Sequence, residues 1–159
     1  MKFDGAVKMT GYYEIEHRAA DGSLKAFERI FNTITSAGKA GAALVIQGSH
    51  SPANVYKFLG LGSSSTAAVV GNTALATEIT SPSLKRIAST MTRVTTNVTD
   101  DSSRAVHTFS STATQAVNEV GLFNSATVSG STLLSRKTIT TKNLVSGDTL
   151  QVTHTLIFA

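Results

Sequence analysis

The chain has no cysteine, no tryptophan and few charged residues. Without cysteine it cannot form a disulfide, a thiolate metal site or a cysteine nucleophile. Charged residues make up 15% of the sequence, against about 25% in an average soluble domain. So few charges are unfavourable for a lone, highly soluble monomer, and this composition favours a protein that is covered by partners.

Long apolar runs and basic clusters are also missing. No stretch approaches the roughly 18 apolar residues that span a bilayer, and the first residues lack a signal-peptide pattern. We therefore expect no membrane partner and a protein made in the cytoplasm. The net charge of +4 comes from dispersed residues, and Lys85-Arg86 and Arg136-Lys137 are only pairs. Direct nucleic-acid binding needs basic residues concentrated on one face, so we do not expect it.

Small hydroxyl residues and alternating apolar residues dominate what is present. Serine and threonine together make up about a quarter of the chain, which favours strands and turns over helices. Asp21-Gly22 supplies the backbone conformation of a tight hairpin turn. Residues 36–47 form the best helix candidate, with Ser36 as the N-cap and Gly48 as the terminator. Residues 63–83, which are polar and small, predict a long ordered loop. Period-two patterns predict strands at residues 12–18, 24–34, 55–61, 85–100 (with a bulge near 92–94), 104–112, 117–124, 132–140 and 150–158.

These elements predict a single mainly β domain over residues 1–159. About seven or eight short strands separated by turns are typical of an antiparallel β-sandwich, jelly-roll-like, or of a barrel. Residues 1–10 do not follow the strand pattern of the core and are interpreted as an extended N-terminal arm.

Candidate catalytic motifs are weak. Ser36 and Lys39 have the spacing of an SxxK nucleophile motif, but neither of its usual partner motifs follows. Glu14 and Glu16 share one face of a predicted strand while His17 points to the other, so they do not make a metal site. We expect no cofactor, no metal and no enzymatic activity. The remaining histidines lie on separate segments and are interpreted as structural: His50, His107 and His154.

The order of short motifs resembles that of a family of virion structural proteins from tailed bacteriophages. The resemblance begins with an N-terminal strand, a D-G turn and an N-x-I-T-x-A-G segment, and it ends with a D-T-L-x-V-T-x-T-L strand. Between them lie a G-x-G turn at 60–62, N-T-A-L at 72–75, E-x-G-L-F-N at 119–124 and G-S-T-L-L-x-R at 130–136.

The resemblance implies a capsid decoration (cement) protein. Such a protein is not an enzyme; it binds the major capsid protein on the outer capsid surface of the virion, after assembly in the host cytoplasm, and we expect homotrimers. The candidate contact residues are Phe3, Val7, Val69 and Val70. A phage tail, baseplate or fibre component is the alternative. A carbohydrate-binding module or enzyme is third, because the chain has no tryptophan and adjacent Tyr12 and Tyr13 cannot share a strand face.

Overall fold

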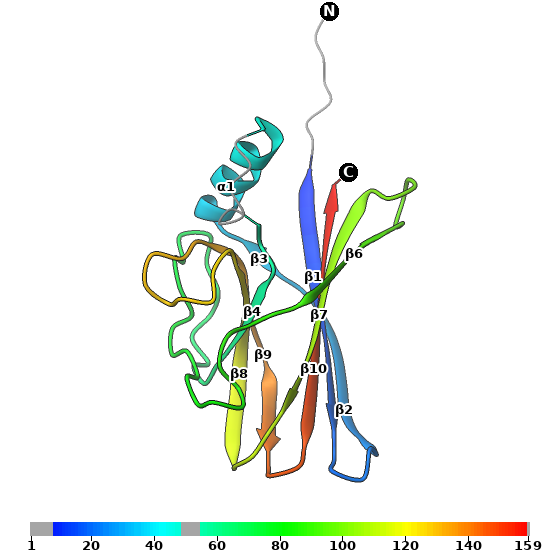
Figure 1. Cartoon of the computed structure of the whole chain (residues 1–159), viewed down its shortest axis with the longest axis vertical. Coiled ribbons are helices and arrows are strands. Elements are labelled where there is room, and N and C mark those ends of the chain that lie inside the picture. Colours follow the sequence, from blue (N-terminus) through cyan, green and yellow to red (C-terminus); the bar gives the residue numbers. More distant parts are fainter. Residues whose placement is uncertain (1–7, 49–54, 159) are drawn as a thin grey trace, which may run out of the picture.

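The computed structural model describes residues 8–48 and 55–158, which form two five-stranded antiparallel sheets and one helix (Figure 1). Sheet A contains, in spatial order, β2 (Leu24–Phe31), β1 (Met9–Arg18), β10 (Thr149–Phe158), β7 (Ser102–Ser110) and β6 (Thr90–Val94). Sheet B contains β3 (Thr33–Ile34), β9 (Leu133–Leu144), β8 (Gln115–Phe123), β4 (Phe58–Gly62) and β5 (Ile87–Ala88). The helix is α1 (Ser36–Ile46).

The two sheets enclose one main hydrophobic core. In β10 the core side chains are Leu150, Val152 and Leu156, which alternate with residues on the outer face as the pleat requires. From sheet B, Val120 and Leu122 meet them. The mainly β prediction is therefore confirmed. Of its two architectures the sandwich is the one observed, because the sheets do not close into a barrel.

One predicted strand, residues 24–34, is split between the sheets. β2 pairs with β1 in sheet A as far as Phe31, whereas Thr33 and Ile34 pair with Arg136 and Ser135 of β9 in sheet B. The prediction of one continuous strand is wrong because Asn32 lies at the crossing, where its N–H donates to Gly11 O (3.0 Å). A strand that bends between two packed sheets forms a corner of the sandwich.

The segment predicted as a bulged strand over residues 85–100 is split in the same way. β5 pairs with β4 in sheet B, and β6 pairs with β7 in sheet A. The interruption lies at Ser89, whose N–H donates to Lys57 O (2.7 Å), and not at residues 92–94. These two splits account for ten strands where eight were predicted.

The helix forms where the sequence predicts it, but its cap is a different residue. Thr35 is the N-cap and its Oγ1 accepts from the N–H of Gly38 (2.9 Å), so the prediction of Ser36 is wrong by one position. Gly48 follows the helix with a φ of 78°, as expected of a terminating glycine. Gly38 lies against the backbone of Leu134, and this close approach holds the helix to β9.

Part of the proposed N-terminal arm belongs to the sheet. Met9 and Thr10 pair with Phe158 and Ile157 at the start of β1, while residues 1–7 lie outside the described residues. In the described part of the chain, α1 is too short to cross a membrane as a helix, and no other helix is present there to do so.

Candidate functional site

The long loop between β4 and β5, residues 63–86, is ordered and lies on the outer face of sheet B. Its N–H of Ser63 donates to Thr77 O (2.9 Å), and its N–H of Ile79 donates to Leu61 O (2.8 Å). Beneath it a second, small hydrophobic cluster forms outside the main core. The members of this cluster are Leu75 from the loop and Phe58, Phe123 and Leu133 from the sheet.

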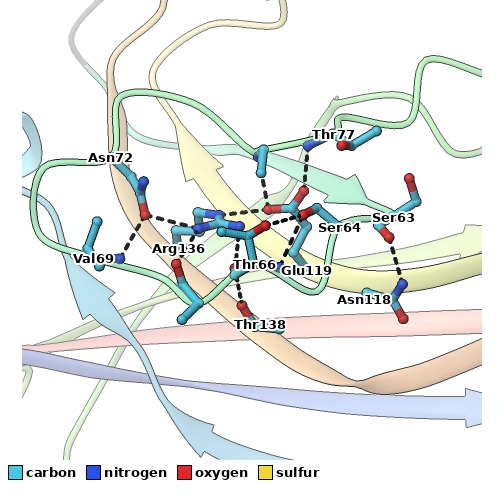
Figure 2. A network of polar contacts seen from close by, with 12 residues as sticks. Ser63, Ser64, Thr66, Val69, Asn72, Thr77, Asn118, Glu119, Arg136 and Thr138 are labelled. Carbon is cyan, nitrogen blue, oxygen red and sulfur yellow. Dashed lines mark hydrogen bonds and ion pairs between the residues drawn. The ribbon is translucent and has the colours of Figure 1, made fainter.

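A fully buried ion pair fastens the loop to sheet B. Arg136 Nε on β9 donates to Glu119 Oε2 on β8 at 2.6 Å, and both side chains are 0% exposed (Figure 2). The guanidinium then reaches into the loop. Its NH1 donates to Ala67 O (3.1 Å) and Asn72 Oδ1 (3.0 Å), and its NH2 donates to Thr66 O (2.8 Å).

Glu119 holds the other side of the loop. Its Oε1 accepts from the N–H of Thr77 (2.8 Å) and its Oε2 from the N–H of Ala76 (3.1 Å). Gly62 of β4 lies directly over this carboxylate, because a Cβ there would come within 2.5 Å of Glu119 Cγ. The carboxylate is thus satisfied by one arginine and two backbone donors, as a buried charge requires.

A second buried ion pair holds the end of the loop. Arg86 donates to both carboxylate oxygens of Glu78, at 2.8 and 2.6 Å, in the two-pronged geometry that is strongest for this pair. Its NH1 also donates to Ser131 Oγ (2.7 Å) and Ser125 O (3.2 Å), and its guanidinium stacks 3.4 Å above the ring of Phe123. This pair therefore ties the loop to the turn that follows β8.

The fastened loop presents two of the four predicted contact residues. Val69 and Val70 have 55% and 57% of their surface exposed. Their backbone is held, because the N–H of Val69 donates to Asn72 Oδ1 (2.8 Å) and Val70 O accepts from the N–H of Ser36 (2.8 Å). The other two predicted residues, Phe3 and Val7, lie outside the described residues.

The residues considered as a metal site lie on opposite faces of sheet A. Glu16 Oε1 accepts from Arg18 Nε at 2.6 Å on the outer face of sheet A. His17 is buried on the opposite side, where its Nε2 lies 2.8 Å from Asp148 Oδ2. The Lys25 ammonium and His17 hold the pKa of Asp148 below its usual range. Across residues 8–48 and 55–158, no three potential metal ligands of the histidine, cysteine or acidic type cluster together.

His154 lies in a buried polar cluster between the sheets. Its Nε2 is 3.1 Å from Ser135 Oγ and 2.6 Å from Asn32 Nδ2, and Ser135 Oγ is 2.8 Å from Tyr13 OH. Burial lowers the pKa of His154 to about 3, so the ring is neutral near pH 7. Tyr13 lies on β1, Ser135 on β9 and His154 on β10, so this buried cluster joins the three strands. His107 is only half-buried and packs edge-on against Phe109, and His50 lies outside the described residues.

An apolar cavity of about 260 Å³ opens between α1 and the end of the sandwich. Its polar lining residues are Ser103, Tyr56 and His154. Apolar side chains supply the rest of the surface, and they come from α1, from both sheets and, for Val55, from the segment before β4. They are Ala42, Val45, Ile46, Val55, Met91, Ala105, Leu122, Leu134, Leu156 and Phe158.

Sequence analysis did not identify the residues that fasten the loop. Glu119 carries the one available signal, since it is the only acidic residue between 117 and 139 and it lies in an otherwise apolar strand. Such a residue predicts a buried partner. The partner, Arg136, looked like half of a solvent-exposed basic pair with Lys137, and nothing local distinguishes the two.

Comparison of the chain with protein-family models, with curated proteins and with solved structures finds no match.

Proposed function

We propose that this chain is a non-enzymatic virion structural protein that binds the outer surface of a phage capsid and stabilises the contacts between its subunits. The proposal takes its biological setting from the motif order described under Sequence analysis. The structural observation that supports it is the loop of residues 63–86, a long segment without regular structure that two buried ion pairs hold in one shape.

Holding the loop in one conformation is better explained by a role in binding than by a contribution to folding stability. Buried ion pairs contribute little net stability compared with well-packed apolar residues, so the role we assign to these two pairs is to specify one conformation of the loop. A loop that is already ordered loses little conformational entropy when a partner covers it. Val69 and Val70 then supply exposed apolar surface on a backbone that is already ordered.

Because a capsid repeats its subunit surface, weak individual contacts are sufficient for stable binding. A capsid presents the same subunit surface many times, so an oligomeric binding protein gains affinity from several simultaneous contacts. We propose homotrimers for this reason, because closed oligomers match the threefold positions of a shell. Light scattering of the purified protein tests the trimer, which has about three times the mass of the chain.

The experiment that tests the function is decoration of purified heads. Heads that lack the protein are mixed with it, and the bound copies are counted by gel densitometry after sedimentation. We expect stoichiometric binding across the shell and greater resistance of the heads to heat. A few copies per particle, located at one vertex, would instead favour a tail, baseplate or fibre component, and no binding would refute a capsid role.

The loop surface is tested by a matched pair of substitutions. Val70→Asp places a charge on the proposed contact, and we expect at least tenfold weaker binding to heads because the carboxylate would be desolvated there. Val98→Asp is the control, since Val98 is similarly exposed but lies in the turn between β6 and β7. Equal binding by both variants would remove the loop from the interface.

A further inference from the structure

The outer faces of the two sheets differ in whether another segment of the chain covers them. The long loop and its own small hydrophobic cluster lie over sheet B. Figure 1 shows the loop and α1 on the side of sheet B, and within the described residues no comparable segment covers sheet A. Phe31, on the edge strand of sheet A, accordingly keeps 74% of its surface exposed.

One row of side chains crosses all five strands on this open face. The register pairs Phe31 with Tyr12, Tyr12 with Thr155, Thr155 with Arg104, and Arg104 with Thr92. Directly opposed residues of antiparallel strands point to the same side of a sheet. Their chain neighbours, such as Tyr13, Ala105 and Leu156, belong to the core, so the row itself faces outward.

Two polar groups in the middle of this row are buried and unpaired. Thr155 Oγ1 and Arg104 Nε make no hydrogen bond to any described residue, and Thr155 is 0% exposed. Buried polar groups in a finished protein surface normally have partners. Both atoms are closed off from solvent, so a partner does not reach them directly; Arg104 as a whole is only partly buried, and the end of its guanidinium remains accessible on this face.

Within the described residues, Arg104 is also the one arginine with no carboxylate oxygen within 4 Å of its guanidinium. Among the described residues, every other arginine has a carboxylate oxygen within 4 Å of its guanidinium. Those arginines are Arg18, Arg29, Arg86, Arg93 and Arg136.

The aromatic end of the row has the composition of a binding hot spot. The guanidinium of Arg29 lies 3.9 Å above the ring of Tyr12, and Phe31 packs edge-on against the same ring, with 6.4 Å between the ring centres. Tyrosine, phenylalanine and arginine are enriched at the centres of protein interfaces. Strands hold these side chains in place, so a partner would find them already positioned.

The described acidic residues of a second copy are a poor source of the carboxylate for Arg104. Most acidic residues of the described part already have close partners, either in ion pairs or in turns. Glu14 and Asp100 are each 3.8 Å from an arginine. The acids with closer contacts are Glu16, Asp21, Glu28, Glu78, Asp101, Glu119 and Asp148.

We propose that the outer face of sheet A binds an acidic surface of a different protein. The residues that define this face are Phe31, Arg29, Tyr12, Thr155 and Arg104. A carboxylate of that partner accepts hydrogen bonds from Arg104, and apolar side chains beside it pack on Phe31, which is 74% exposed and packs against the buried ring of Tyr12. This inference does not depend on the capsid assignment. A protein that binds one neighbour through the loop on sheet B and another through sheet A bridges the two.

The test uses an acidic peptide as the probe. The ¹⁵N-labelled protein is titrated at low salt with a hexapeptide that alternates glutamate and leucine and is blocked at both ends. A hexapeptide that alternates lysine and leucine is the control. We expect saturable shifts of the backbone amides of Tyr12, Arg104 and Thr155 with the acidic peptide only, and weaker binding as salt is added.

A matched pair of variants decides the role of the arginine. Arg104→Gln keeps most of the side-chain stem and removes the charge, and we expect at least fivefold weaker peptide binding. Arg93→Gln is the control on the adjacent strand. Arg93 is 78% exposed, lies 3.8 Å from Asp100 and is paired with Ser103, so it points to the opposite side of the sheet from Arg104. The Arg93→Gln variant should therefore bind the peptide as the wild type does.

A second variant keeps the test decisive if Arg104→Gln does not fold. Phe31 is largely exposed, so Phe31→Ala should fold normally and bind the peptide at least threefold more weakly. The absence of saturable shifts, shifts confined to the loop or to sheet B, equal binding of the lysine peptide, or full binding by folded variants would each overturn the proposal.

Discussion

The buried ion pair between Glu119 and Arg136 makes the strongest prediction about stability. Arg136→Met removes a side chain that is 0% exposed and leaves Glu119 as an uncompensated buried carboxylate. Breaking one partner of such a pair costs about 3–5 kcal/mol. The same change removes the donors to Thr66, Ala67 and Asn72 of the loop. In a domain of this size each kcal/mol lowers the Tm by about 2–4 °C, so we expect a decrease of about 10 °C.

Two measurements separate global stability from loosening of the loop. Urea unfolding gives the free energy of unfolding, and digestion with elastase under native conditions reports opening of residues 63–84, which contain several alanine and valine cleavage sites. We expect elastase to cut Arg136→Met in this segment much faster than the wild type. Arg18→Met is the control: its ion pair with Glu16 is partly exposed, so the change should cost at most about 1 kcal/mol.

A double variant tests the reason for the loss. If the unpaired carboxylate is the main penalty, Glu119→Gln should cost at least about 1 kcal/mol less in the Arg136→Met background than in the wild type. The reasoning would be refuted if Arg136→Met lost less than about 1 kcal/mol, or if its loop resisted elastase as the wild type does.

Two further predictions concern α1 and the core. Gly38→Ala should destabilise the protein by about 1–3 kcal/mol in urea unfolding, because the added Cβ would lie 2.7 Å from Leu134 Cα, although alanine is the better helix former. Gly71→Ala, with no atom within 4 Å of the new Cβ, should change stability by less than about 1 kcal/mol; a similar loss in both variants would contradict this packing argument. Burial lowers the pKa of His154 to about 3, so the unfolded chain binds a proton more readily, and the free energy of unfolding should fall as pH decreases from about 6.5 towards 3, by up to about 4 kcal/mol. His154→Gln should lose most of this slope between pH 6.5 and 4, and an NMR titration showing protonation of His154 above pH 5 would contradict the prediction.

The strands were predictable where the pattern is local. Val152 and Leu156 alternate with threonines, and the pleat places them in the core whichever strand lies beside them. Asp21-Gly22 forms the turn between β1 and β2, and Gly22 has the expected positive φ of 85°. The helix followed from its alanines and from the glycine after it.

The candidate surfaces were only partly predictable. Val69 and Val70 were selected because their segment lacks a strand pattern, and both are exposed. The row through Tyr12, Thr155 and Arg104 was not found, because its paired residues are 143 and 51 positions apart in the sequence and meet only through strand pairing. The pattern of each strand shows its two faces but not its neighbours.

The sequence by itself determined which segments are extended, where the turns and the helix lie, and that one side of most strands is buried, since these follow from the pleat, the backbone freedom of glycine and the placement of apolar residues. Tertiary structure alone decided where the chain crosses between the sheets, at Asn32 and Ser89, and why Arg136 is buried whereas the adjacent Lys137 is not. The physical reason is distance along the chain: the contacts of Arg136 with the loop join residues 64 to 70 positions apart, and no local pattern encodes which partner meets it there.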